Sequence, residues 1–307
     1  MKYEVAVIAD LCMDLLVAGD VKPIYGQVEQ YVNDYQTDIG GSGSIFAAQY
    51  NKLGGNAAMF GIVGEDDFGS MLTQKIEEIG MSTDFLFTSE NVKTALGLNL
   101  AYEDDRAMLT YKGTLGEVSE EQIKACGIFD KTDHVHISSY FLLDQLHSMW
   151  VPLLSELELK GVSVSLDTNW APEGNWSAVH PLLPYIDVFI PNEEEALQIS
   201  GMSSCDEAGR WLSSRCGMVV MKRGANGARV FKGETVRDFS VPEALAKGLK
   251  IADTTGAGDN FGAGFVWSWL RNKPLEEAIK MAITCGTSSL RKLGGIEGQY
   301  VPHAVEA

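Results

Sequence analysis

The sequence predicts an α/β fold in which a mostly parallel central sheet is flanked by helices, with a small β-ribbon lid. Short apolar, β-branched runs alternate along the chain with stretches whose apolar residues recur every three or four positions. Several of the helical stretches end at a glycine. Two polar, turn-rich segments, residues 15–37 and 94–114, break this alternation, and we expect them to form antiparallel ribbons that act as a lid. The simplest organisation is one domain, residues 1–307, with this lid.

The expected elements follow one another in the order that βαβ units require. The expected strands are residues 3–9, 57–64, 134–138, 162–167, 188–192, 218–222 and 228–231. The expected helices are residues 44–54, 69–80, 145–161, 193–200, 261–272 and 275–290. Strands that alternate with helices favour a parallel sheet, because each helix carries the chain back to the start of the next strand.

The expected strand 134–138 contains an HxH pair, His134 and His136. Two histidines could bind a metal ion. The alternation of a strand explains the pair better, with one residue on each face.

Composition excludes several classes of partner. The chain of 307 residues has 24 basic and 42 acidic side chains, a net charge of −18. Such a charge argues against binding nucleic acid or an anionic membrane surface. An anionic ligand must therefore be held by backbone dipoles, by a metal ion or by a few placed cations.

The cysteines and the N-terminus indicate a cytoplasmic location. The five cysteines are scattered and form no CxxC pair, as in proteins of reducing compartments. Acidic residues interrupt the apolar run MKYEVAVIADLCMD, which favours a strand over a signal peptide. No apolar stretch is long enough to cross a bilayer. We expect a soluble, cytoplasmic protein.

The stretch DTTGAGDNF at residues 253–261 carries the strongest chemical signal. Gly256, Ala257 and Gly258 lie at or just before the first turn of the helix expected from residue 261, where amide groups are unpaired and the dipole is positive. Small residues let a phosphate reach these amides. Asp259 could then accept a proton from an attacking hydroxyl. Asp is also a common helix-capping residue, and spacing alone leaves both interpretations open.

Motifs of other enzyme classes are absent from the sequence. It contains no GxxxxGK[ST], no dinucleotide-binding glycine pattern, no GxSxG and no HExxH. These absences argue against a P-loop protein, a dinucleotide-binding enzyme, a serine hydrolase and a zinc protease.

Four segments together resemble the ribokinase/fructokinase (PfkB) family of carbohydrate kinases over nearly the whole chain. DTTGAGDNF resembles the family's second signature, and GGSGSIFAAQYNKLGGNAAMFGIVGEDDFG at 40–69 resembles its first. Asn192 to Glu195 matches its NxxE motif, and KRGANGA at 222–228 resembles its nucleotide loop. The resemblance implies a ribokinase-like fold and ATP-dependent transfer of a phosphoryl group to a hydroxyl of a small sugar.

The resemblance also implies roles for individual residues. Asp259 would be the general base, and the amides of Gly256, Ala257 and Gly258 would stabilise the transferred phosphoryl group. The residues expected to bind ATP are Asn192, Lys222, Gly224, Gly227 and Gly258. Asn192 and Glu195 would position Mg²⁺ through water, and Asp253 with the backbone of Thr255 matches a monovalent-cation site that would take K⁺.

For the acceptor, Asp14 matches the aspartate that ends the family's first strand and binds sugar hydroxyls. The other candidate acceptor contacts are Gly40, Gly41, Ser42, Ile45, Asp167, Asn169 and the lid residues Tyr102 and Arg106. Ile45 replaces a family asparagine, which would leave a hydroxyl unpaired at a cost of about 1–3 kcal/mol. Ribose itself is therefore disfavoured. DTNWAPEGNW at 167–176 keeps part of the pattern of the acidic-sugar kinases but lacks its arginine.

Two alternatives stay open from the sequence. One is a nucleoside kinase of the same family, in which Ile45 would pack on a base. The other is a catalytically silent sugar-binding protein, which the intact run from Asp253 to Asp259 argues against. The alternating lid segments also predict a homodimer formed through the lid.

Overall fold

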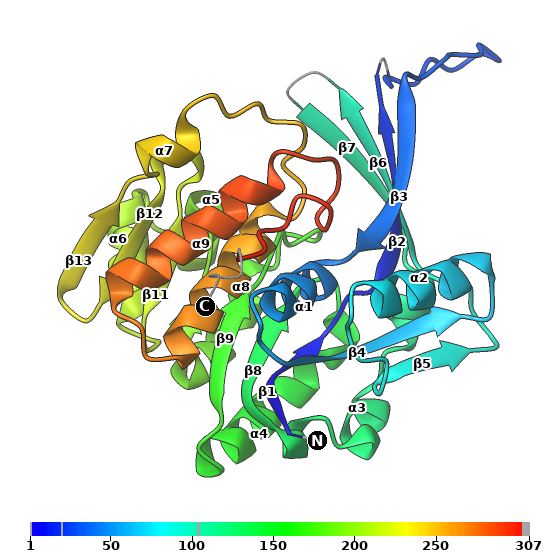
Figure 1. Ribbon diagram of the computed structural model, residues 1–307. Helices are drawn as coiled ribbons and strands as arrows, with labels where there is room; N and C mark the ends of the chain where they lie inside the picture. Colours follow the sequence, from blue (N-terminus) through cyan, green and yellow to red (C-terminus); the bar gives the residue numbers. More distant parts are fainter. Residues whose placement is uncertain (1, 20, 103–104, 303–307) are drawn as a thin grey trace, which may run out of the picture.

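The computed structural model describes residues 2–19, 21–102 and 105–302, and only the backbone of residues 101–102 and 105–106. Within them, nine strands form one sheet in the order β13-β12-β11-β10-β9-β8-β1-β4-β5 (Figure 1). These strands are β1 (Tyr3–Ile8), β4 (Ala57–Gly64), β5 (Leu86–Ser89), β8 (Thr132–Ser138), β9 (Ser163–Asp167), β10 (Val188–Phe189), β11 (Val219–Lys222), β12 (Ala228–Lys232) and β13 (Thr235–Phe239). Neighbours are parallel except the two pairs that involve β12. The mostly parallel sheet predicted from the sequence is confirmed.

A second, smaller sheet stands apart from the main one (Figure 1). Its strands, in the order β3-β2-β6-β7, are β2 (Cys12–Ala18), β3 (Asp34–Gly40), β6 (Leu96–Tyr102) and β7 (Asp105–Tyr111). The hairpin-like pairs β2–β3 and β6–β7 are antiparallel, and β2 joins β6 in parallel. Asp14 therefore lies inside β2 of the small sheet, and the expectation that it ends the first strand is wrong. The chain leaves the main sheet after Ile8 and re-forms a strand at Cys12.

Helices cover both faces of the main sheet. They are α1 (Ser42–Lys52), α2 (Asp67–Glu78), α3 (Glu120–Cys126), α4 (His147–Leu159), α5 (Glu193–Ser200), α6 (Cys205–Ser213), α7 (Glu243–Ala246), α8 (Ala257–Leu270) and α9 (Leu275–Ser289). One core cluster contains residues of α3 to α6, and a second contains residues of α1, α2, α8 and α9. Because both faces of the sheet are buried, β1, β4 and β11 are mostly apolar, whereas β8 and β9 also bury polar side chains such as His134, His136 and Ser165.

The sequence analysis missed β5, β13, α3, α6 and α7. β5 is short and lies at one edge of the sheet, and β13 lies at the other edge with mostly exposed side chains. The apolar signal of a buried strand is therefore weak in both. α3 begins with a capping box between Ser119 and Gln122, and α6 is capped by Ser204, so side-chain caps mark the starts of both.

Small residues bring α8 and α9 into close contact. A Cβ atom on Gly264 would lie 2.9 Å from the Cys285 sulfur and 3.0 Å from the Ala282 Cα. A Cβ atom on Gly286 would lie 3.0 Å from the Ala257 carbonyl oxygen. Glycine at these positions lets the two helix backbones approach, which fixes where α8 begins.

In the described part of the chain, no helix is both long and apolar enough to span a bilayer. The five cysteines are all free thiols.

His134 and His136 lie on the same face of β8. Both side chains are buried, and their ring nitrogens lie 2.7 and 2.8 Å from the Ser165 hydroxyl. The expectation of opposite faces is wrong, because residues two apart in a strand point to the same side. The His136 ring also stacks on Phe46 at a centroid distance of 3.7 Å. Burial lowers the pKa of His134 to about 3, and lowers that of His136 well below 6.5.

We predict that His134 and His136 stay neutral in the folded protein from about pH 8 down to about pH 5.5. In the unfolded chain each takes up a proton near its usual pKa, so the pair reduces stability as the pH falls below about 6.5, by up to about 1.4 kcal/mol per pH unit for each ring. NMR titration of the imidazole protons checks this, with the urea-unfolded protein as control. Titration of both rings near the unfolded value in the native protein would contradict it.

Candidate active site

Charged and polar side chains gather beyond the carboxyl ends of the central strands. Asp10 follows β1, Ser139 follows β8, Asp167 ends β9 and Lys222 ends β11. The N-termini of α1 and α8 face the same region, since Ser42 contacts Asn169 and Gly258 contacts Lys222. In α/β sheets this edge is where ligands bind.

The start of α8 presents unpaired amide groups. Gly256 is the N-cap, with a left-handed backbone (φ 70°), and no side chain caps the helix. Among the described residues, no acceptor bonds the amides of Gly258 and Asp259, and that of Ala257 reaches the Thr254 carbonyl only at 3.4 Å. α8 therefore opens with amides that are available to an anion, as predicted. Asp259 is the third residue of the helix rather than its cap.

Ile45 packs against the N-cap residue of this helix. It is 3% exposed, and a Cβ atom on Gly256 would lie 3.0 Å from its Cγ2 atom. Its other terminal atoms pack against Gly295. The structure thus gives Ile45 a packing role against Gly256, and its predicted contact with the acceptor stays a prediction.

A buried ion pair lies beside these amides. The Lys222 ammonium is 2.5 Å from the Asp167 carboxylate, and the side chains are 14% and 2% exposed. The same ammonium would lie 3.2 Å from a Cβ atom on Gly258. Burial alone would lower the pKa of Lys222, but the charges of Asp167 and Glu195 raise it above its ordinary value. A permanent positive charge therefore adjoins the start of α8.

Asp259 has the properties of a base that works near neutral pH. Its side chain is half-buried. Burial raises the pKa of Asp259 to about 7, the charge of Asp167 adds to the rise, and the charge of Lys222 and the nearby Ser42 hydroxyl oppose it. A carboxylate with this pKa can take up and release a proton at physiological pH.

Two residues of this site were missed by the sequence analysis, Asp10 and Ser139. Asp10 accepts hydrogen bonds from the amides of Ser42 and Gly43 and from the Ser139 hydroxyl at 2.6 Å. Asn169 donates to the hydroxyls of both Ser42 and Ser139. The signal that could have found Asp10 is its place directly after the first buried strand.

Comparison with known proteins identifies the family. Residues 2–301 match the family described as pfkB family carbohydrate kinase. The chain belongs to the pfkB family of carbohydrate kinases. It is therefore an ATP-dependent sugar kinase with a ribokinase-like fold, and a catalytically silent binding protein is disfavoured.

Individual relatives agree with this assignment. The kinase is 27% identical over 256 residues to an uncharacterized sugar kinase of Archaeoglobus fulgidus, which covers 83% of this chain and 99% of the relative. It is 24% identical to a ribokinase of Lactococcus lactis, over 96% of this chain and 93% of that protein. The solved ribokinase of Arabidopsis thaliana, complexed with ribose and ATP, superposes with a TM-score of 0.80 at 22% identity, covering 97% and 96% of the two chains.

In this kinase, Asp14 lies on the face of the small sheet that carries Gly97. Glycine at 40 and 97 leaves room for the Asp14 carboxylate, because a Cβ atom at either position would collide with it. Burial raises the pKa of Asp14 to about 7, and hydrogen bonds from Asn99 and Cys12 oppose the rise. The side chains of the candidate contacts Tyr102 and Arg106 lie outside the described residues.

Asn192 and Glu195 form a capping box at the start of α5. The Asn192 side chain accepts from the Glu195 amide at 2.8 Å, and Glu195 accepts from the Asn192 amide at 2.7 Å. Glu195 is 4% exposed, and burial raises its pKa while the charge of Lys222 opposes the rise. In the described chain, no three His, Cys, Asp or Glu side chains are grouped to hold a metal ion directly. Mg²⁺ bound mainly by water and phosphate fits this donor set.

One of the other predicted loops is shaped by glycine backbone conformations, and the other is held by an aspartate side chain. Gly224 and Gly227 flank the turn between β11 and β12 with positive φ angles of 53° and 84°. The Asp253 carboxylate accepts from the amides of Thr255 and Gly294 at 3.0 and 2.9 Å. Asp253 thus ties the loop before α8 to the segment after α9.

We predict that Lys222→Met lowers the free energy of unfolding by about 3–5 kcal/mol, because it leaves the buried Asp167 charge unpaired. The double variant Asp167→Asn/Lys222→Met should recover most of this loss without recovering activity. Urea unfolding followed by tryptophan fluorescence measures both. A single variant as stable as the parent would contradict the buried pair.

Proposed function

We propose that this kinase transfers the γ-phosphoryl group of ATP to a hydroxyl of a small sugar or sugar derivative at the start of α8. The observation that carries the proposal is the combination of unpaired amides at Gly258 and Asp259 with an Asp259 carboxylate whose pKa is about 7. One element thus supplies both an anion site and a base.

The proposed reaction is a direct displacement. The acceptor oxygen forms a bond to the γ-phosphorus as the bond to the bridging oxygen of ADP breaks. Asp259 takes the hydroxyl proton, and the amides of Gly256, Ala257, Gly258 and Asp259 stabilise the charge on the transferred group. Lys222 contributes a positive charge beside Gly258.

ATP would lie along the strand ends near Lys222, Gly224 and Gly227. Asn192 and Glu195 would hold Mg²⁺ through water, and the ion would neutralise phosphate charge when bound with ATP. A K⁺ site at Asp253 and Thr255 rests on the family resemblance, since the Asp253 oxygens already accept two backbone amides. The cytoplasmic location also stays a prediction.

Asp14, Asp167 and Asn169 are the proposed acceptor contacts, with the backbone of Gly40, Gly41 and Ser42. Within the described residues, the buried Asp167 Oδ1 atom has no hydrogen-bond partner, so it can accept from a ligand hydroxyl. Ile45 offers no hydrogen bond to replace that of an asparagine, which disfavours ribose. Its packing against Gly256 and Gly295 also removes the reason for proposing a nucleoside base beside it.

We predict that Asp259→Asn lowers kcat by about 10²–10⁴ while ATP still binds, because only the proton acceptor is lost. In the parent, kcat/KM should fall about tenfold per pH unit below about pH 7, as the base becomes protonated. ADP release over an acceptor library measures both. Turnover of the variant at the parent rate would show that another group is the base.

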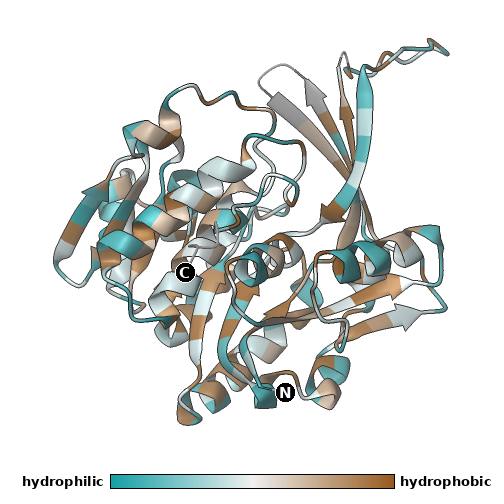
Figure 2. Cartoon of the chain, in the orientation of Figure 1, coloured by the Kyte–Doolittle hydropathy of each residue, from teal (hydrophilic) through white to brown (hydrophobic). Residues whose placement is uncertain are grey.

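We also propose that the kinase forms a homodimer through the outer face of the small sheet. The register of β3, β2, β6 and β7 places Tyr35, Leu109 and Tyr111 on the face opposite Asp14. These three side chains are 70%, 61% and 50% exposed. In Figure 2 this sheet carries hydrophobic segments, while β3 is mostly hydrophilic. Exposed apolar residues grouped on one face are typical of an interaction surface.

We expect Leu109→Lys to convert the dimer into a monomer, because it places a charge in the apolar face. Light scattering measures the mass, and Met71→Lys on α2 is a matched control at another exposed hydrophobic residue. A parent protein that is monomeric at micromolar concentration would contradict the dimer proposal.

A further inference from the structure

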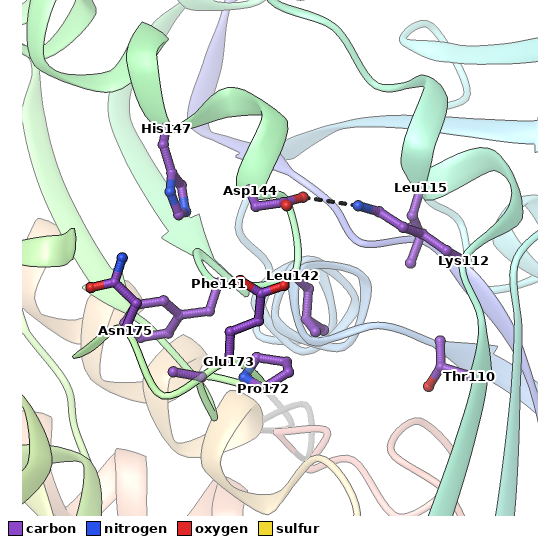
Figure 3. Close-up of a pocket in the computed structure, with 11 residues that line it drawn as sticks. Thr110, Lys112, Leu115, Phe141, Leu142, Asp144, His147, Pro172, Glu173 and Asn175 are labelled. Carbon is purple, nitrogen blue, oxygen red and sulfur yellow. Dashed lines mark hydrogen bonds and ion pairs between the residues drawn. The ribbon is translucent and has the colours of Figure 1, made fainter. Parts of the chain in front are cut away.

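A pocket of about 490 Å³ lies next to the proposed acceptor contacts and has no role in the reaction described above. Three segments form it: the end of β7, the segment after β8 and the segment after β9 (Figure 3). Its polar lining residues are Thr110, Lys112, Asp144, His147, Glu173 and Asn175. A volume of this size suits a small organic group rather than a single water or ion.

The pocket is joined to the acceptor site by the strand register of the small sheet. Asp14 pairs with Gly97 on β6, and Gly97 pairs with Thr110 on β7. Paired residues point to the same face, so Asp14 and Thr110 flank Gly97 on one side of the sheet. Gly97 has no side chain, so at this position β6 places no side-chain atoms between Asp14 and Thr110, although the Asn99 amide lies beside it.

The segments that follow β8 and β9 of the main sheet also join the pocket to the acceptor site. Ser139 and Asn169 belong to the site and bond to each other at 3.1 Å. Two residues later on the same segments, Phe141 and Ala171 line the pocket. Ser139 and Asn169 both have a left-handed backbone, with φ angles of 49° and 56°. Strained residues of this kind are typical of ligand-binding segments.

The charges of the pocket leave one carboxylate uncompensated. The Lys112 ammonium is 2.8 Å from the Asp144 carboxylate, so these two charges neutralise each other across the pocket wall (Figure 3). Glu173 is exposed and forms no ion pair with any described side chain. The formal charge of Lys112, Asp144 and Glu173 taken together is therefore negative.

The hydrogen-bonding groups also favour a donor as ligand. The His147 ring stacks on Tyr140, and its Nε2 atom is 3.0 Å from the Tyr140 carbonyl oxygen. A carbonyl only accepts, so Nε2 carries a proton, and in the ring form with a single proton Nδ1 is an acceptor. Glu173 adds two acceptor oxygens and Asn175 adds one. Lys112 is already engaged with Asp144.

We propose that this pocket is an acceptor subsite that binds a positively charged amine, so that the natural acceptor is a sugar derivative with an amine-bearing substituent. The proposal rests on the proposed function for the position of the sugar ring at Asp14. The sugar occupies the space between Asp14 and Asp259, and the substituent extends over Gly97 into the pocket. Glu173 binds the ammonium group, and Asn175 and Nδ1 of His147 accept hydrogen bonds from it.

The test compares aminoethyl, hydroxyethyl and carboxyethyl glycosides of fructose and of ribose. Their affinities for the parent enzyme and for Glu173→Gln are measured by calorimetry, with Glu158→Gln on α4 as a matched control away from the pocket. For one of the two sugars, we expect the aminoethyl glycoside to bind the parent about threefold to fivefold more tightly than the hydroxyethyl glycoside, as for a partly exposed ion pair. Glu173→Gln should abolish this preference, and Glu158→Gln should keep it.

Equal affinity for the three end groups, preference for the carboxyethyl end, binding of none of the glycosides, or a preference that survives Glu173→Gln would each overturn the subsite. Phosphorylation is followed separately through ADP release. Turnover without any preference for the amine contradicts the subsite alone. Amine-dependent binding without turnover of any acceptor supports the subsite and contradicts the proposed phosphoryl transfer.

Discussion

The buried pair of Lys222 and Asp167 is the interaction on which the arrangement of the site depends. The chain carries a net charge of −18, and three further carboxylates, Asp10, Glu195 and Asp259, lie near this pair. Lys222 supplies the compensating positive charge at the place where a phosphate would meet the amides of α8. Without it, like charges would raise the pKa of Asp259 further and repel the anionic substrate.

The fold positions the Lys222 charge because several strands of the main sheet end at the same edge of the sheet. β9 and β11 bring Asp167 and Lys222 together, and β1 ends just before Asp10, which holds the first turn of α1. Glycines then let backbone segments approach where a side chain would collide. Because Gly256 has no side chain, Ile45 packs directly on its backbone. Gly286 likewise lets α9 pack against the start of α8. The packing of the core thereby sets the position of the amides.

Much of the fold could be predicted because both faces of the main sheet are buried. Apolar runs mark β1 and β4 in the sequence, and β-branched alternation marks β8 and β9, whereas the exposed edge strand β13 has no such signal. The anion site at α8 could be predicted from the sequence. Small residues at a helix start leave its amides accessible to a phosphate, and a carboxylate beside them can act as a base. The network of Asp10 and Ser139, and the partner of Lys222, depend on contacts between residues far apart in the chain, which spacing does not show.

The central claim is that the amides at the start of α8 hold the transferred phosphoryl group with Asp259 beside it. A crystal structure with ADP, Mg²⁺, aluminium fluoride and an acceptor tests this directly, because the fluoride imitates the phosphoryl group in transfer. We expect the fluoride within hydrogen-bond distance of the Gly258 and Asp259 amides, with the Asp259 carboxylate facing the acceptor hydroxyl. A fluoride bound away from these amides, or an Asp259 side chain turned from the acceptor, would contradict the account.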